Sequence, residues 1–317
     1  MRHIEPIDID DVRAARARIG STAVRTPLVR LPVDTPAEIY LKLESLQPIG
    51  SFKLRGATNA IRSLDPDTLK DGVYTASAGN MAQGVAWGAR ALGVPCAVIM
   101  PESAPRTKVE AVERLGASVV FLPYDEWWQA LADHGRAGMR GTFVHPVADR
   151  AVMAGNGTIG LEIVEDLPDV SAVLVPFGGG GLVSGIATAV RALAPTATVY
   201  ACEVATSTPL TAALAANAPV LVERRPSFVD GIGGRGVLPE MWPIVRSLVD
   251  GAMVASLDDV ARAVRLLIER VRIVAEGAGA TPVACALSSP PPAPRIVCVV
   301  SGGNIDTRTL IDVMSRA

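Results

Sequence analysis

Short apolar segments alternate with amphipathic helical segments along most of this chain, and this alternation limits the folds that it can adopt. Between residues 72 and 146, four apolar segments predict strands and three segments between them predict helices. The predicted strands are residues 73–76, 96–100, 118–122 and 142–145, and the predicted helices are residues 80–92, 106–115 and 125–139. Strand–helix–strand repetition with short connections is typical of a parallel sheet covered by helices.

A second alternation begins after residue 146. Its predicted helices are residues 154–166, 182–193 and a helix that starts at the capping box of Ser256 and Asp259, and its predicted strands are residues 172–176, 197–204 and 296–300. Near the start of the chain, residues 10–19 predict a helix and residues 39–43 a strand. We therefore predict an α/β fold with two domains: a small one of residues 63–149, inserted into a large one of residues 1–62 and 150–317. A cleft between two such units is a common ligand site.

The charge balance excludes several classes of partner. The chain has 30 Lys and Arg residues against 32 Asp and Glu residues, and no basic cluster for nucleic acid or a membrane surface. Residues 170–190 carry no charge, but the glycines in their middle would break a spanning helix. The acidic start lacks an apolar signal core, and Cys96, Cys202, Cys285 and Cys298 lie far apart, so we expect a cytoplasmic protein with reduced thiols.

Four consecutive glycines, at positions 178–181, lie between a predicted strand and a predicted helix. Glycines let backbone N–H groups approach an anion closely, and a helix N-terminus adds positive potential. The order G-x-G-x-x-G is absent from this run and no Gly-Lys-Ser/Thr occurs, so neither the dinucleotide fingerprint nor the triphosphate loop applies. The run predicts a site for a single phosphate group; a flexible turn is the alternative.

Two further strand ends carry small and polar residues. Residues 77–80 (Ser-Ala-Gly-Asn) precede a predicted helix, where a carboxylate would fit or where the residues only cap the helix. Residues 301–304 (Ser-Gly-Gly-Asn) follow the last predicted strand, at the sheet edge where open α/β proteins place ligands.

Lys53 is the candidate nucleophile. Most lysines are solvated surface charges, but this one is flanked by Phe52 and Leu54 and followed by small residues, which predicts partial burial and a lowered pKa. Such an amine could form an imine. Only three histidines occur, without a zinc-binding spacing, and no G-x-S-x-G elbow is present, so a zinc site and a serine hydrolase are both disfavoured.

An imine-forming lysine, a phosphate cradle and polar strand ends are together what pyridoxal phosphate needs. Residues 51–57 (Ser-Phe-Lys-Leu-Arg-Gly-Ala), 77–84 (Ser-Ala-Gly-Asn-x-x-Gln-Gly), 178–182 and 301–304 resemble, in this order, the four motifs of the threonine/serine dehydratase and serine racemase family. The resemblance covers nearly the whole chain. It implies fold type II, the tryptophan-synthase-β type, with pyridoxal phosphate in the cleft between the two domains, and a homodimer.

The resemblance also implies a role for each motif. Lys53 would hold the cofactor as an internal aldimine and then act as base at the substrate Cα. Asn80 would hydrogen-bond the ring hydroxyl, Phe52 would flank the ring, and Ser301 would face the pyridine nitrogen. The implied phosphate-binding residues are Gly178, Gly179, Gly180, Gly181 and Leu182. The implied residues around the substrate carboxylate are Ser77, Ala78, Gly79, Asn80 and Met81.

The implied partner of the pyridine nitrogen narrows the reaction. A serine hydroxyl protonates that nitrogen less strongly than a carboxylate does, so the ring would be a moderate electron sink. Loss of a β-hydroxyl group drains the charge promptly, which favours elimination over transamination. We expect β-elimination of water from L-threonine, L-serine or a related β-hydroxy amino acid, giving a 2-oxo acid and ammonia.

Two alternatives remain open. Racemisation needs a second acid–base group opposite Lys53, and the family's racemases carry a serine where this chain has Ala78. A racemase or a β-replacement enzyme of the same fold is therefore the second reading. A non-catalytic protein that binds a small molecule is the more remote one.

Three positions depart from the family pattern. Met81 stands where many dehydratases have a histidine, which could shift the substrate preference toward a less usual β-hydroxy amino acid. Glu203 matches the first residue of a divalent-cation site found in some members, but Pro209 stands where their second carboxylate is expected. The sequence therefore leaves a cation requirement open.

Overall fold

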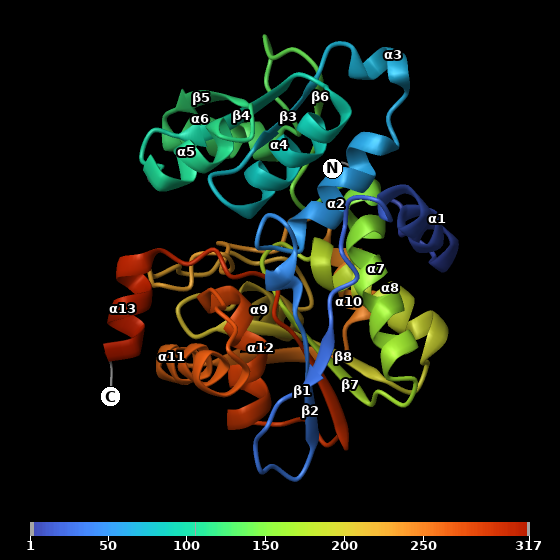
Figure 1. The fold of residues 1–317 in the computed structure, drawn as a ribbon, viewed down its shortest axis with the longest axis vertical. Helices are drawn as coiled ribbons and strands as arrows, with labels where there is room; N and C mark the ends of the chain where they lie inside the picture. Colours follow the sequence, from blue (N-terminus) through green and yellow to red (C-terminus); the bar gives the residue numbers. More distant parts are fainter. Residues whose placement is uncertain (1–2, 105, 316–317) are drawn as a thin grey trace.

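Ten strands form two separate sheets in the computed structural model, which describes residues 3–104 and 106–315. The larger sheet has six strands in the order β1-β2-β10-β7-β8-β9 (Figure 1). All neighbouring strands run parallel except β1 and β2, which pair antiparallel. The strands are β1 (Leu28–Arg30), β2 (Glu38–Lys42), β7 (Ala172–Pro176), β8 (Thr198–Val204), β9 (Gly251–Ala255) and β10 (Arg295–Val299).

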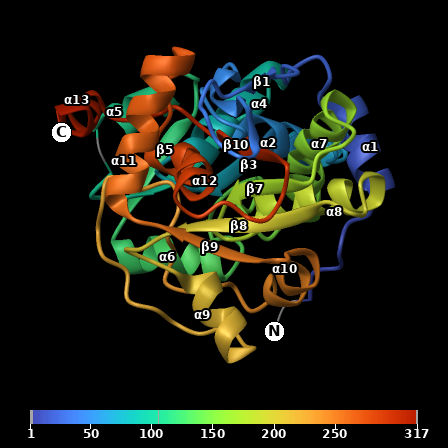
Figure 2. The same ribbon diagram turned by 90° about the horizontal axis from the view of Figure 1, so that it is seen from below.

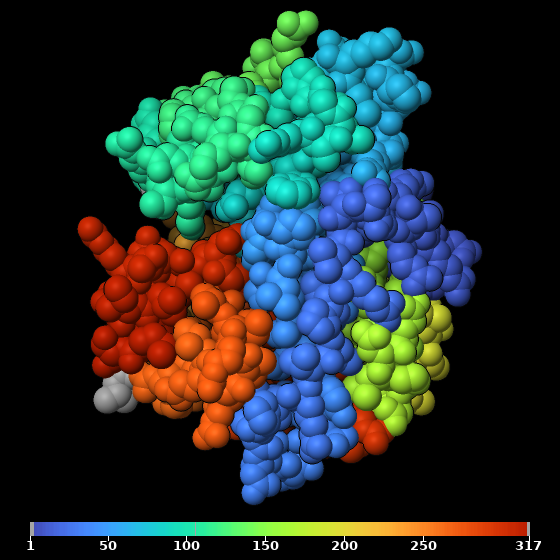
Figure 3. Space-filling model, in the orientation of Figure 1, coloured from blue at the N-terminus to red at the C-terminus, as the bar shows by residue number. Residues whose placement is uncertain are grey.

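The smaller sheet has four parallel strands in the order β5-β4-β3-β6. They are β3 (Val73–Ala76), β4 (Cys96–Pro101), β5 (Ser118–Leu122) and β6 (Thr142–Phe143). With their helices they form the upper, cyan-to-green lobe in Figures 1 and 3, and the surface in Figure 3 is hollowed where this lobe meets the red C-terminal segment. The predicted α/β class with parallel-rich sheets is confirmed.

Apolar contacts cross one of the predicted domain boundaries. Helix α2 (Lys53–Arg62) precedes residue 63, yet its Ala57 and Ile61 share a hydrophobic cluster with Val73 and Met81 of the smaller sheet and its helix. This helix therefore packs against the upper lobe. The domain limits at residues 62/63 and 149/150 stay a prediction.

Helices cover both faces of the six-stranded sheet, as the view from below shows (Figure 2). Strand β7 explains why, because side chains alternate between the faces of a strand. Val173 and Val175 join the cluster formed with α7 and α8, whereas Ala172 and Leu174 join the cluster formed with α11 and α12. The helices are α1 (Ile9–Ile19), α2, α3 (Pro66–Leu69), α4 (Asn80–Leu92), α5 (Arg106–Glu113), α6 (Tyr124–Ala132), α7 (Arg150–Asp166), α8 (Gly181–Leu193), α9 (Pro209–Ala216), α10 (Trp242–Leu248), α11 (Leu257–Leu266), α12 (Gly277–Ser288) and α13 (Thr307–Ser315), with short helical turns at Glu44–Leu46 and Leu267–Val271.

Several predicted element ends differ from the structure. The helix predicted to reach residue 139 ends at Ala132, since His134 has a positive φ of 56° and cannot continue a right-handed helix. The strand predicted to reach residue 145 ends at Phe143. Helix α7 begins four residues earlier than predicted, because the Asp149 side chain caps its first turn by accepting from the N–H groups of Ala151 and Val152.

Two expectations, on the cysteines and on membrane-spanning segments, can be compared with the structure. Cys202, Cys285 and Cys298 are buried and Cys96 is partly buried, and all four are free thiols. In the part of the chain that the structure describes, no helix is both long enough and apolar enough to cross a membrane.

Candidate active site

One cavity of about 400 Å³ is lined by residues from both the four-stranded and the six-stranded layer. Every residue that the motifs single out for a cofactor or a substrate lines it. These residues are Phe52, Lys53, Ser77, Ala78, Gly79, Asn80, Met81, Gly178, Gly179, Gly180, Gly181, Leu182 and Ser301. Residues from four distant stretches of the chain therefore share one concave site.

Lys53 begins helix α2 and points into this cavity. Its backbone position is set by the preceding residues, because the N–H of Phe52 donates to the Ser301 carbonyl at 2.9 Å and Ser51 bridges to Gly302. The Lys53 Nζ donates to the carbonyl oxygen of Pro146 at 2.8 Å. Burial lowers the pKa of Lys53 to about 8, because a charged ammonium is poorly solvated there. A substantial fraction of neutral amine, the nucleophilic form, is thus present near pH 8.

The glycine run forms a tight turn between β7 and α8. Gly180 has a φ of +100°, which side chains other than glycine rarely adopt. A Cβ at Gly179 would meet Val147 at 2.7 Å, and one at Gly181 would meet the Val147 carbonyl at 2.8 Å. The run brings bare backbone to the cavity at a helix N-terminus, where N–H groups lack intrahelical partners. This arrangement fits an anion such as phosphate.

Gly79, in the turn between β3 and α4, differs from the glycines of residues 178–181. A Cβ at Gly79 would meet nothing within 4 Å, so packing does not require glycine at this position. Gly79 lines the cavity and precedes the first turn of α4, and its N–H faces the Ser77 Oγ at 3.2 Å. Open space above a helix N-terminus leaves room for a bound carboxylate.

Asn80 belongs to a group of polar residues that the sequence analysis only partly found. Its Nδ2 donates to Glu276 Oε1 at 2.8 Å, and its Oδ1 accepts from Asn304 Nδ2 at 2.8 Å. Burial, and then the nearby Asp230 carboxylate, raise the pKa of Glu276 to about 7. Asn304 belongs to the last motif, for which no role of its own was predicted, and Glu276, which lies 196 residues from Asn80, belongs to none of the motifs.

Other lining residues also went unrecognised. The cavity is further lined by Gln83, Lys108, Trp127, Pro146, Val147, Pro176, Asp230, Gly231, Ile232 and Ala278. Lys108 Nζ and Asp230 Oδ2 form an ion pair of 2.7 Å. A Gly-rich loop at residues 231–236 and an acidic residue before the Gly-Ala-Gly-Ala start of α12 were the available signals.

Glu203 lies outside the cavity. One of its carboxylate oxygens accepts from the Leu210 N–H at 2.7 Å, and the other accepts from the N–H and Oγ1 of Thr211 at 2.9 and 2.6 Å. The carboxylate therefore caps helix α9. Within residues 3–104 and 106–315, no group of three or more His, Cys, Asp or Glu side chains could hold a metal ion.

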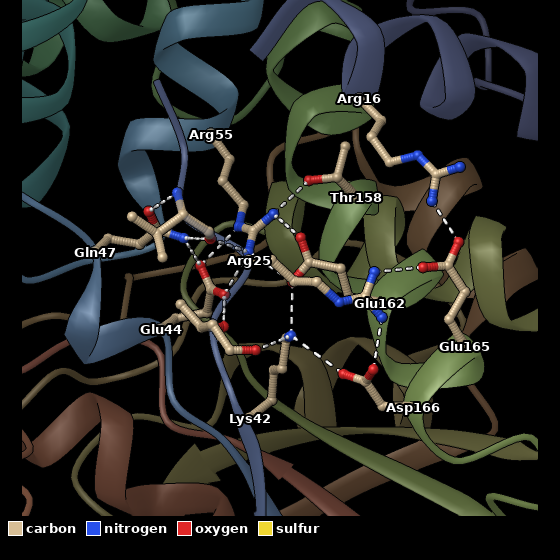
Figure 4. A network of polar contacts seen from close by, with 12 residues as sticks. Arg16, Arg25, Lys42, Glu44, Gln47, Arg55, Thr158, Glu162, Glu165 and Asp166 are labelled. Carbon is tan, nitrogen blue, oxygen red and sulfur yellow. Dashed lines mark hydrogen bonds and ion pairs between the residues drawn. The ribbon is translucent and has the colours of Figure 1, made fainter. Parts of the chain in front are cut away.

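A buried charge network holds the helix that carries Lys53 (Figure 4). The Arg55 guanidinium forms paired hydrogen bonds of 2.8 Å with Glu44 and of 2.7 and 2.9 Å with Glu162. Lys42 Nζ lies 2.6 Å from Glu162. Although burial alone would raise the pKa of Glu44, Arg55 beside it lowers this pKa. Two cations thus balance two carboxylates, and α2 is tied to α7 and to strand β2.

The cavity has the groups that pyridoxal phosphate requires. It offers a partly buried amine of lowered pKa for the aldehyde, a side-chain-free turn at a helix N-terminus for the phosphate, and the amide of Asn80 and the hydroxyl of Ser301 for the ring. The Lys53 Nζ lies 5.2 Å from the centre of the Phe52 ring, so an aromatic face borders the amine. The donor set therefore fits this cofactor.

Comparisons with known proteins agree with this fit. Residues 20–302 match the family model described as pyridoxal-phosphate dependent enzyme. The chain is 44% identical over 282 residues to an L-threonine ammonia-lyase of Geobacter sulfurreducens, covering 88% of this chain and 70% of that protein. It is 38% identical over 317 residues to the L-threonine ammonia-lyase of Thermotoga maritima, covering 98% and 79%.

A solved structure gives the same result for the fold. Maize serine racemase superposes with a TM-score of 0.89 at 30% identity, covering 98% of this chain and 97% of that one. The predicted fold type II is thereby confirmed. This chain belongs to the threonine/serine dehydratase and serine racemase family of pyridoxal-phosphate-dependent enzymes.

Proposed function

We propose that this protein is an ammonia-lyase that eliminates water from L-threonine or L-serine and releases a 2-oxo acid and ammonia. The observation that carries the proposal is the Lys53 amine, which is partly buried, has a lowered pKa and lines the same cavity as the glycine turn. The relatives' activity supports it, since two of them are L-threonine ammonia-lyases.

The residues would divide the work as follows. Lys53 would bind the cofactor covalently, the glycine turn would hold its phosphate, Asn80 would contact its ring hydroxyl and Ser301 its ring nitrogen. The bound cofactor supplies an electron sink for a carbanion at the substrate Cα. Residues 77–80 would orient the substrate carboxylate at the N-terminus of α4. The Lys53 Nζ would act as the base for the Cα proton.

The surroundings of Lys53 favour the same reaction. Its amine is partly buried and lies in a cavity also lined by Phe52, Pro146 and the glycine turn, so its pKa is lowered. A neutral amine at about its pKa both accepts and returns a proton efficiently. Ser301 is itself buried, and its hydroxyl would leave the ring nitrogen incompletely protonated, which favours prompt loss of the β-hydroxyl.

A racemase is the second candidate, and the close fold match to maize serine racemase favours it. The cavity opposes this reading at one position. Ala78 lines the cavity where the family's racemases have a serine, and a methyl group cannot exchange a proton. We therefore place racemisation second to elimination. We also propose, from the family resemblance, that the protein is a cytoplasmic homodimer, which sedimentation and fractionation would test.

The substrate panel tests the proposal directly. The purified enzyme with pyridoxal phosphate is given L-threonine, L-serine and β-hydroxy amino acids with larger β-substituents, because Met81 replaces a polar donor in the wall. We expect release of ammonia and 2-oxo acid from at least one of them. Lys53→Ala should abolish both this release and the absorbance of covalently bound cofactor. Formation of D-serine without 2-oxo acid would instead identify a racemase, and no turnover at all would identify a binding protein.

A further inference from the structure

The side-chain amide of Asn80 is held from both ends. Its nitrogen donates to Glu276 Oε1 at 2.8 Å, and its oxygen accepts from Asn304 Nδ2 at 2.8 Å. Asn304 is itself fixed, since the same nitrogen donates to the Ile49 carbonyl at 2.9 Å. The three side chains come from the start of α4, the N-cap of α12 and the loop after β10, so the contacts join distant parts of the chain.

These two contacts define one orientation of the Asn80 amide. A flip would point the Asn80 oxygen at a Glu276 oxygen and the Asn80 nitrogen at the Asn304 nitrogen. The pair of nitrogens would be mismatched at any pH, because an amide nitrogen only donates, and the pair of oxygens would be mismatched above about pH 7, where the Glu276 carboxylate is ionised and only accepts. After its contact with Glu276, the Asn80 nitrogen retains one N–H, which is available to a ligand in the cavity.

The geometry points to Glu276 as a positioning residue: with Asn304 it clamps the Asn80 amide, so that an N–H group of Asn80 is presented to the ring oxygen of the cofactor. This inference rests on the proposed role of Asn80 as partner of that oxygen. Glu276 acts on the cofactor through Asn80 and is not itself assigned a chemical step.

The surroundings of Glu276 explain why a carboxylate is kept there. Its side chain is only 5% exposed, and glycines pack against it, with a Cβ at Gly302 reaching Glu276 Oε1 within 2.6 Å. The charged groups that act on it are Asp230, which disfavours its ionised form, and Lys108, which favours it, and the Asn304 backbone N–H also donates to it. Burying a carboxyl group costs free energy unless polar partners satisfy it, and here the side-chain partner is the Asn80 amide.

The test compares two ligands that differ only in the group that Asn80 would hold. Pyridoxal 5′-phosphate and 3-deoxypyridoxal 5′-phosphate both carry the aldehyde and the phosphate, but only the first has the ring hydroxyl. Their affinities for the full-length apo-protein are measured by absorbance titration. The wild type should prefer pyridoxal phosphate by about fivefold to tenfold, the worth of one hydrogen bond in a buried site.

The variants remove the clamp from either end. Glu276→Ala and Asn304→Ala should each reduce this preference to less than about twofold, whereas Glu276→Gln, which keeps an acceptor oxygen, should retain it. Glu203→Gln is the matched control, since Glu203 is also a buried carboxyl but lies outside the cavity. It should leave the preference between the two ligands unchanged.

Each other outcome overturns the inference. Variants that weaken both ligands equally would show that Glu276 only supports the fold. A loss of preference in Glu276→Gln would show that the charge matters and the orientation does not. If the wild type binds both ligands covalently with equal affinity, the assigned role of Asn80 is wrong and the clamp has no function. If Lys53 binds neither ligand, the proposed function itself fails, which the missing absorbance band would reveal separately.

Discussion

Burial changes the acid–base properties of two side chains in the cavity in opposite directions. It lowers the pKa of Lys53 to about 8, because the charged form of a base is destabilised away from water. It raises the pKa of Glu276 to about 7, because here the charged form is the deprotonated one. Both pKa values move toward neutral pH, so both side chains change their protonation state near pH 7 to 8.

Lys53 should therefore set the pH dependence of cofactor attachment. Only the neutral amine attacks an aldehyde, so the rate constant for covalent binding of pyridoxal phosphate should rise about tenfold per pH unit below pH 8 and level off above it. Stopped-flow absorbance of the apo-protein measures this rate. A rate that keeps rising beyond pH 10 would mean that the Lys53 amine is solvated and ordinary.

Glu276 should make the apo-protein less stable as the pH rises. Its pKa in the folded protein is about 7, against 4.5 for the exposed group, so the folded state binds the proton more tightly between these values. Stability is then highest below pH 4.5 for this group and decreases up to pH 7, by at most about 3 kcal/mol. Urea unfolding of the wild type and of Glu276→Gln isolates the effect.

The comparison between these two proteins also removes the contributions of other groups. Burial raises the pKa of Glu203 and of Asp149 in the same direction, but both are unchanged in the variant. The variant should be relatively more stable at pH 8 than at pH 4. An equal stability difference at both values would contradict the raised pKa of Glu276.

At the scale of elements, periodicity predicted the strands better than the helix ends. Eight strand cores, among them β3, β4, β5 and β7, lie where apolar runs are bounded by turn residues. Helix ends depended on side chains whose role is visible only in three dimensions, such as the Asp149 cap and the positive φ of His134. Strands β1 and β9 and helices α2, α3, α9, α10, α12 and α13 were not predicted. In α9 and α12 the apolar residues show no clear period of 3.6.

The site likewise contains residues that local motifs identify and residues that only the fold brings into the cavity. Every motif residue assigned to the cofactor or substrate lines the cavity, because three motifs follow the strands β3, β7 and β10, and the lysine motif is joined to the residues after β10 by the Phe52–Ser301 hydrogen bond. Glu276, Lys108 and Asp230 were missed, since the glycine-rich sequence beside Glu276 and Asp230 does not by itself identify their polar partners and nothing beside Lys108 does. Such contacts depend on how distant segments pack.

Helix α2 depends on its buried charge network, and Arg55→Lys should test this. A lysine cannot form the paired hydrogen bonds that Arg55 makes with Glu44 and Glu162, so one buried carboxylate loses its partner. We expect a loss of about 3 kcal/mol in the free energy of unfolding. Arg25→Lys is the matched control, because Arg25 pairs with Glu165 and Asp166 at the half-exposed surface.

The control should change stability by less than about 1 kcal/mol. Urea unfolding of both apo-proteins gives the comparison, and the far-ultraviolet spectrum shows that the variants keep the fold. Equal losses in the two variants would mean that the buried network has no special importance for α2. A normal stability of Arg55→Lys would contradict the expectation outright.

At the scale of the whole molecule, two polar contacts besides those of Asn80 connect the four-stranded layer with the six-stranded one. Lys108 on α5 pairs with Asp230 at 2.7 Å, and His134 after α6 lies 3.2 Å from Glu240 before α10. Lys108 and Asp230 both line the cavity and are both partly exposed, so they lie at its edge toward solvent. Access to the amine therefore passes a contact that salt can weaken.

Lys108→Gln should make the cavity more accessible and remove the salt dependence of that access. The pair is partly exposed and worth up to about 1 kcal/mol, so its loss should speed entry of a small reagent by no more than about fivefold. The measurement is the rate at which hydroxylamine removes the bound cofactor, followed by absorbance at low and high salt. In the wild type this rate should increase with salt, whereas in the variant it should already be high and constant. Arg106→Gln breaks the exposed pair with Glu110 on the same helix and should behave like the wild type. A salt response that survives in Lys108→Gln would show that other contacts between the two layers control access.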